Sequence, residues 1–159
     1  MRNEKGIYFD AQATKADNGD KLFFMLDTLG EGTAVNNNNN LMFRFEKLDY
    51  GLVGQVQSRH TINSATRGYI SLNNHPNISY TTTQMDTYVR VSMFVPYEMI
   101  KEIAPNATFD SFDDDLFFTV YGANSSFIEN IIYDGNEIVW SKPNNYLILS
   151  KENEIIVRK

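Results

Sequence analysis

The chain has 159 residues, of which 42% are hydrophobic and 13% aromatic, so it can bury the core of one ordinary domain and is not expected to be disordered. Its 20 acidic residues outnumber 14 lysines and arginines, and the net charge of -6 argues against nucleic acid or an anionic membrane surface as a partner. There is no cysteine, which excludes disulfides, thiolate metal sites and thiol nucleophiles.

Short runs rich in aromatic and β-branched residues, separated by Asn, Asp and Gly, predict strands joined by turns along the whole chain. The predicted strands are, in chain order, Gly6–Ala13, Lys21–Thr28, Leu41–Leu48, Leu52–Ser58, Gly68–Leu72, Ile78–Thr83, Thr87–Val95, Leu116–Tyr121, Phe127–Tyr133, Glu137–Trp140, Tyr146–Ser150 and Glu154–Arg158. Many short strands at near-regular spacing are typical of an all-β antiparallel sandwich, and we expect a jelly-roll-like single domain over residues 1–159.

The patterns inside these runs predict which strands are buried. In Thr87–Val95 every second residue is Val or Met, so one face of that strand is expected in the core. Lys21–Thr28 and Leu116–Tyr121 are apolar on both faces, as in the middle of a layered sheet. Asp134–Gly135 predicts a tight hairpin, because Gly accepts the positive φ that such turns require. Tyr97–Ile103, between two prolines, is the one predicted helix.

Catalytic motifs are absent from the sequence. It contains no nucleophile elbow, phosphate-binding loop, paired-histidine zinc helix or dinucleotide fingerprint. A glycosidase would need two carboxylates facing each other across a sugar, and acidic residues such as Glu46, Asp86 and Glu98 cannot be paired from sequence alone. We therefore do not expect an enzyme.

Two acidic segments are candidates for binding Ca²⁺, which prefers carboxylate and carbonyl oxygens from loops. The first contains Asp110, Asp113 and Asp114, and the second is Asp17–Asp20. Neither has the spacing of an EF-hand loop, and the alternative for the first is a solvated turn before a strand. A calcium site at Asp110, Asp113 and Asp114 is therefore a secondary expectation.

Aromatic residues and planar hydrogen-bonding groups suggest a sugar site, because sugar rings stack on Trp and Tyr while their hydroxyls suit Arg and Asn. Trp140, the only tryptophan, adjoins one loop, and Arg59, Arg67, Tyr69 and Asn74 lie in another loop-rich stretch. If these residues converge, Trp140 forms a stacking platform and the others contact hydroxyls. The alternatives are a core position for Trp140 and surface salt bridges for the arginines.

Four segments that together span most of the chain resemble, in their order and spacing, the segments of a known group of domains. They are GIYFDAQA at residues 6–13, NLMFRF at 40–45, YVRVSMFVPYEMI at 88–100 and IVWSKPNNYLIL at 138–149. This order resembles the family 9 carbohydrate-binding modules and the wider DOMON-like β-sandwich group. The resemblance implies a non-catalytic carbohydrate-binding module of a bacterial secreted or cell-surface protein, with a glycan or polysaccharide as partner and further domains in a longer chain.

The chain departs from that group at its sugar site. Sugar-binding members hold a ring between two tryptophans, whereas this chain has only Trp140, so either Tyr50 or Tyr69 takes the place of the second tryptophan or the site is altered or lost. The Trp-containing segment that usually precedes the first strand is also missing. The alternative function is a structural or adhesion domain of a phage or bacterial surface assembly, which exposed apolar strand faces and oligomerisation would favour.

Overall fold

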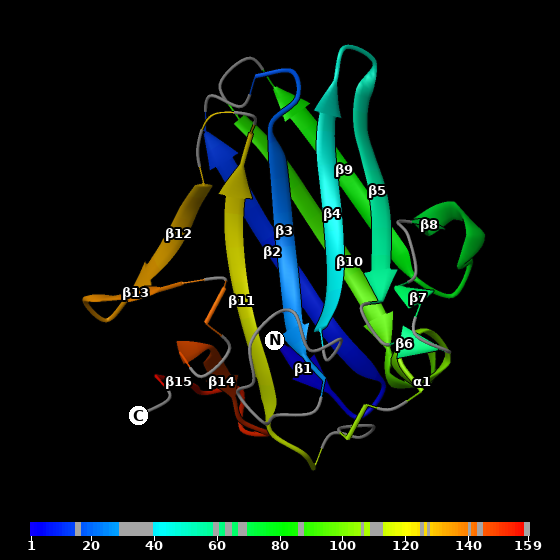
Figure 1. Cartoon of the computed structure of the whole chain (residues 1–159), viewed down its shortest axis with the longest axis vertical. Helices are drawn as coiled ribbons and strands as arrows, with labels where there is room; N and C mark the ends of the chain where they lie inside the picture. Colours follow the sequence, from blue (N-terminus) through cyan, green and yellow to red (C-terminus); the bar gives the residue numbers. More distant parts are fainter. Residues whose placement is uncertain are drawn as a thin grey trace.

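Two antiparallel sheets pack face to face, one behind the other in Figure 1, and this confirms the predicted antiparallel β-sandwich. The computed structural model describes residues 1–14, 17–28, 40–58, 61–62, 65–66, 70–85, 88–105, 107–108, 113–124, 126, 128–139, 141–142 and 145–157. The strands of the rear sheet run obliquely behind those of the front sheet.

The smaller sheet lies at the rear of Figure 1 and has the strand order β1-β2-β10-β9. Its strands are β1 (Arg2–Asn3), β2 (Gly6–Thr14), β10 (Tyr88–Pro96) and β9 (Ser79–Met85). β10 is central, because it pairs with β2 along one edge and with β9 along the other.

The larger sheet has the order β13-β12-β11-β3-β4-β5-β8, with β14 pairing to β11 and β15 to β14. Its strands are β3 (Lys21–Asp27), β4 (Asn40–Leu48), β5 (Gly51–Ser58), β8 (Ile70–Ser71), β11 (Leu116–Ala123), β12 (Ile128–Tyr133), β13 (Asn136–Ile138), β14 (Leu147–Leu149) and β15 (Ile155–Val157). Each predicted strand overlaps an observed one, with ends that differ by a few residues.

Four further elements complete the described chain. α1 (Tyr97–Ile103) has the predicted bounds and is the one α-helix among the described residues. Four elements were not predicted: β1, the 3-10 helix η2 (Leu72–Asn74) and the pair β6 (Thr61–Ile62) and β7 (Ala65–Thr66). No helix in the described part of the chain is long and apolar enough to cross a membrane.

An aromatic chain crosses the core and joins the two sheets. Phe9 of β2 packs on Phe24 of β3, with ring centroids 4.8 Å apart. Phe45 of β4 meets Tyr80 of β9 at 5.5 Å in an edge-to-face arrangement. Such contacts bury large apolar areas between the layers and hold the sheets in one relative position.

The predicted one-sided burial of β10 is confirmed. Val89, Val91, Met93 and Val95 are at most 4% exposed, while the residues between them are half-buried or exposed. Since successive side chains alternate across a strand, the alternate residues of β10 form part of an outer face of the sandwich.

The predicted apolarity of the middle strands on both faces is also confirmed. On the side of the large sheet away from the main core, a second buried cluster contains Phe23, Met25, Met42, Tyr121 and Tyr146. Phe23 and Tyr121 stack with their rings 4.4 Å apart, and the Tyr146 hydroxyl donates to the sulfur of Met25. The large sheet is therefore buried on both sides along β3 and β11.

The predicted tight turn between β12 and β13 is present. Asp134 and Gly135 have φ values of 48° and 74°, in the left-handed region that such hairpins use.

Candidate functional site

The structure describes two of the six residues predicted to bind sugar. Asn74 is exposed in η2, and Tyr50 is 81% exposed in the turn between β4 and β5. No hydrogen bond or ring contact joins these two residues. Arg59, Arg67, Tyr69 and Trp140 lie outside the described residues. The convergence of the six therefore stays a prediction.

The predicted calcium ligands are described in part. Asp113 is exposed and Asp114 half-buried just before β11, where the Asp114 carbonyl accepts a hydrogen bond from the Arg2 guanidinium. Asp110 lies outside the described residues. Among the described residues, no three His, Cys, Asp or Glu side chains gather as metal ligands would. The calcium site at Asp110, Asp113 and Asp114 stays a prediction.

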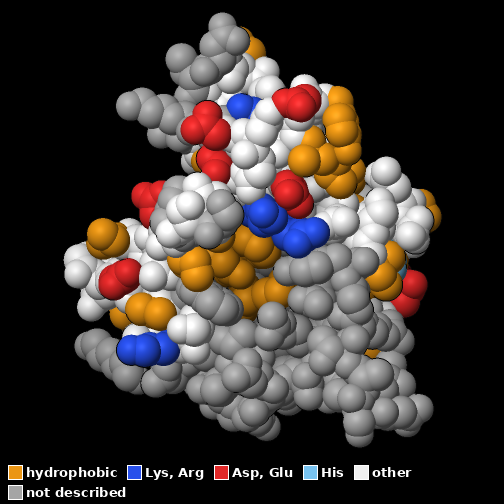
Figure 2. Space-filling model, turned by 45° about the horizontal axis from the view of Figure 1, so that its top comes forward, with side chains coloured by type: hydrophobic (Ala, Val, Ile, Leu, Met, Phe, Trp, Pro, Cys, Tyr) orange, Lys and Arg blue, Asp and Glu red, His pale blue; other side chains and the backbone are white. Residues whose placement is uncertain are grey.

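The second acidic segment, Asp17–Asp20, is held by hydrogen bonds within the protein. The Asp20 carboxylate accepts from the backbone N–H of Asp17 at 2.8 Å and from the amide of Asn124 at 3.1 Å. The Asn18 amide donates to Asp49 in the β4–β5 turn. These bonds tie three turns together at the upper end of the molecule, where Figure 2 shows acidic, basic and apolar side chains intermixed. A structural role accounts for this segment.

A different surface brings aromatic and polar side chains together. It is the outer face of the small sheet, built from the outward residues of β2, β10 and β9, and we call it the β2–β10–β9 face. Paired strands place their residues in cross-strand rows. From the lower end upward, these rows are Tyr8, Phe94 and Ser79; Asp10, Ser92 and Thr81; Gln12, Arg90 and Thr83; and Tyr88 with Met85.

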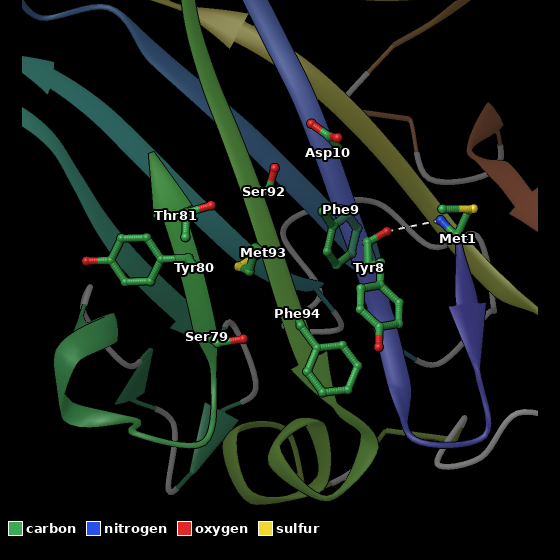
Figure 3. A pocket seen from close by; sticks show the side chains of 10 residues that line it. All are labelled: Met1, Tyr8, Phe9, Asp10, Ser79, Tyr80, Thr81, Ser92, Met93 and Phe94. Atoms are coloured by element: carbon green, nitrogen blue, oxygen red, sulfur yellow. Dashed lines mark hydrogen bonds between the residues drawn. The ribbon is translucent and has the colours of Figure 1, made fainter. Parts of the chain in front are cut away.

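The first row carries an aromatic pair that is open to solvent. Tyr8 and Phe94 lie side by side on neighbouring strands (Figure 3), with ring centroids 4.5 Å apart and planes inclined by 35°. Tyr8 is 42% exposed and Phe94 is half-buried. With the second row and Met1 they line an open depression of about 320 Å³. This pair presents apolar ring surface beside hydroxyl groups.

Gly6 at the start of β2 allows this arrangement. A Cβ there would lie 2.3 Å from the Val95 carbonyl oxygen and 2.9 Å from Cε2 of Phe94. Because real Cβ atoms do not approach backbone so closely, only glycine lets β2 and β10 meet beneath the Phe94 ring.

An ion pair lies next to the aromatic pair. Arg90 donates to both carboxylate oxygens of Asp10, with an Nε–Oδ1 distance of 2.8 Å. The hydrogen bond from Arg90 lowers the pKa of Asp10, and the Ser92 hydroxyl lowers it further, while the same pair raises the pKa of Arg90. Both side chains are half exposed. The pair is therefore charged at neutral pH and fixed in orientation, with polar atoms still accessible.

The side chains of the β2–β10–β9 face carry no net charge on a chain whose net charge is -6, while the Met1 ammonium group lies at its edge and donates to the Tyr8 carbonyl. Among its described residues, Asp10 and Arg90 are the only charged side chains, and their charges cancel. The other polar groups are hydroxyls and one amide, that of Gln12. Such a surface neither attracts nor repels a charged ligand strongly, and it offers many hydrogen bonds to a neutral one.

Sequence reasoning found part of this face. The alternation in Thr87–Val95 places Tyr88, Arg90, Ser92 and Phe94 on one side of a strand. The contribution of β2 was missed, because the pairing that sets Tyr8 beside Phe94 joins segments more than 80 residues apart. The signal that could have indicated it is the alternation of exposed Tyr8, Asp10 and Gln12 with apolar residues in β2.

No protein-family model matches this chain, and no curated protein or solved structure gives a significant match. The resemblance to the family 9 carbohydrate-binding modules therefore stays a prediction. The candidate site rests on the geometry of the β2–β10–β9 face.

Proposed function

We propose that the protein is a non-catalytic carbohydrate-binding domain and that the β2–β10–β9 face is its binding surface. The observation that supports this is the exposed Tyr8–Phe94 pair beside the fixed Asp10–Arg90 pair. Sugar rings stack their C–H faces on aromatic rings, and their hydroxyls pair with carboxylates, guanidinium groups and hydroxyls. In a longer secreted or cell-surface protein, the domain would attach its neighbours to a polysaccharide.

The nature of the face favours sugar over other ligand classes. Phosphate-bearing ligands need a surplus of positive charge, which the Asp10 carboxylate cancels at Arg90. An apolar small molecule needs a deep cavity that encloses it, whereas the depression at Tyr8 is open. An open surface that is rich in hydroxyls and carries no net side-chain charge fits a neutral polyol.

A glycan array tests the proposal directly, using the purified protein and two variants. Tyr8→Ala should weaken binding about tenfold, because one stacking ring is lost. Ile156→Ala is the control, since Ile156 is 46% exposed and lies on β15 rather than on the face. The proposal fails if the folded wild-type protein binds no glycan, or if Tyr8→Ala binds as well as wild type.

The same array distinguishes this surface from the site expected from the sequence. If Trp140→Ala abolishes binding while Tyr8→Ala retains it, the sugar site lies at Trp140 and not on the β2–β10–β9 face. Repeating the array with a chelator tests the calcium expectation at Asp110, Asp113 and Asp114, because only a calcium-dependent site loses its signal.

A structural or adhesion role in an assembly is the second candidate, and exposed isoleucines favour it. Ile128 and Ile132 of β12 are 50% and 75% exposed, and Ile155 and Ile156 of β15 are 39% and 46% exposed. The Tyr133 hydroxyl donates to the Ile155 carbonyl at 3.3 Å and so links the two strands. Exposed apolar residues on neighbouring elements can contribute to contact surfaces.

Light scattering coupled to size-exclusion chromatography tests the second candidate. An assembly domain should form oligomers as its concentration rises, and Ile132→Lys should shift the population toward monomer. A protein that stays monomeric at every concentration and binds glycans contradicts it.

A further inference from the structure

We infer that the ligand is an internal stretch of an extended, neutral polysaccharide that lies along β10 from the Tyr8–Phe94 pair to Tyr88. This inference rests on the proposed function and specifies the substrate class of the same surface. It follows from the length of the face, from the position of a second aromatic residue and from the open depression at Tyr8.

The second aromatic residue lies in the fourth cross-strand row. Tyr88 is opposite Thr14 of β2 and Met85 of β9, on the same side of the sheet as Phe94. Tyr88 is half-buried, and Met85 is 57% exposed beside it. Both ends of the face therefore carry apolar surface on which a sugar ring can stack.

The separation of the two aromatic positions excludes a single sugar as the full ligand. Six residues of extended strand separate Phe94 from Tyr88, which corresponds to roughly 20 Å along β10. That length exceeds one pyranose ring several times. Between the two ends lie the rows containing Ser92 and Arg90, whose hydroxyl and guanidinium groups can bond to the hydroxyls of intervening sugars.

The described cross-strand rows between the Tyr8–Phe94 pair and Tyr88 contain no unpaired charged side chain. No charged side chain other than Asp10 and Arg90 lies on the described residues of this face, and these two are paired across neighbouring strands. A site for a chain terminus encloses the terminal sugar, whereas here the depression at Tyr8 is open to solvent. An internal segment of a chain can therefore lie on the face without an end group to recognise.

The test is calorimetric titration of the whole protein with neutral oligosaccharides in series from disaccharide to hexasaccharide. The probes are the β-1,4-linked gluco-, xylo- and manno-oligosaccharides and the α-1,4-linked malto-oligosaccharides. For the series that binds, affinity should rise at least about tenfold from disaccharide to hexasaccharide, because a second aromatic contact is gained.

Two variants assign that gain to the two ends of the face. Tyr88→Ala should remove the gain in affinity for the hexasaccharide and leave disaccharide binding unchanged. Tyr8→Ala should weaken both. Chemical-shift mapping on the wild-type protein gives the same answer without a variant, since the hexasaccharide should perturb β10 amides from Phe94 to Tyr88 and the disaccharide only those near Phe94.

The outcomes separate this inference from the proposed function. Equal affinity for disaccharide and hexasaccharide, or hexasaccharide shifts confined to the Phe94 end, overturns the inference and leaves a sugar-binding domain with a short site. No binding to any member of the four series or to the glycan array overturns both.

Discussion

Gly54 in β5 faces the core where the two sheets meet. A Cβ at this position would lie 2.8 Å from Cδ1 of Leu72 and 2.9 Å from Cε1 of Phe45. Leu72 and Phe45 are each at most 1% exposed, so neither can move into solvent to make room. Gly54→Ala should therefore destabilise the fold by about 1–3 kcal/mol, measured by guanidinium unfolding.

Gly122 in β11 provides the matched control for this substitution. A Cβ there meets no atom closer than 3.9 Å, which is ordinary contact. Gly122→Ala should leave stability unchanged or raise it by up to about 1 kcal/mol, because alanine restricts the unfolded chain. Equal losses in the two variants would contradict the crowding at Gly54.

The Asp10–Arg90 pair predicts a specific dependence of stability on pH. Arg90 lowers the pKa of Asp10 from its ordinary value of 3.8, so the pair stabilises the fold above that pH, and the contribution is lost as pH falls through the lowered pKa. Asp10→Asn should melt slightly below wild type at neutral pH, because the pair is half exposed and screened by solvent.

Melting temperatures of wild type and Asp10→Asn between about pH 7 and pH 2.5 measure this effect. The difference between the two proteins should stay constant down to about pH 4 and shrink only below it, as Asp10 becomes protonated. Convergence of the two curves near pH 6 would show that Asp10 does not have the lowered pKa that its bond to Arg90 requires.

At the level of elements, the backbone amides of β9 and β10 should differ sharply in their rates of hydrogen exchange. β10 is paired on both edges, whereas β9 pairs with β10 alone among the described residues, and only Tyr80 of its residues is half-buried. Amides of β9 that point away from β10 should therefore exchange faster than the amides of β10. Residue-resolved exchange measures this, and slow exchange along the free edge of β9 would show that something covers it.

Elements defined by local chemistry were predictable from the sequence. α1 follows Pro96 and ends just before Pro105, so its bounds match the prediction. The turn at Asp134–Gly135 was predicted for a similar reason, since the two residues themselves adopt positive φ. β6 and β7 could not be predicted, because a two-residue strand has no periodicity and forms only through its pairing partner.

At the scale of the whole molecule, the candidate site depends on pairings that no local pattern contains. The alternation of β10 separates its buried from its exposed residues, but it does not specify that β2 and β9 are its neighbours or in which register they pair. A shift by one residue would bury Tyr8 and expose Phe9. The site predicted from loop residues was therefore inferred from composition, whereas the β2–β10–β9 face emerges from long-range pairing.

Long-range contacts also determine how the first strand is held. Arg2 of β1 is 3% exposed, and its guanidinium donates to the Ser150 carbonyl at 3.1 Å and to the Asp114 carbonyl. Its backbone N–H and C=O bond the side chain of Asn153 at 2.6 Å and 3.0 Å. β1 is thereby joined to the segment before β11 and to the turn between β14 and β15.

Replacing Arg2 tests whether these contacts stabilise the molecule as a whole. In Arg2→Lys a single ammonium group replaces the planar fork that reaches both carbonyls, so at least one buried acceptor loses its partner. Chemical unfolding should show a loss of about 1.5–3 kcal/mol, as for other hydrogen bonds to charged groups. Lys5→Ala, which removes an exposed positive charge nearby, should change stability by less than about 0.5 kcal/mol. If Arg2→Lys is as stable as wild type, the geometry of the fork is not required, and β1 is held by its pairing with β2 and by its backbone bonds to Asn153.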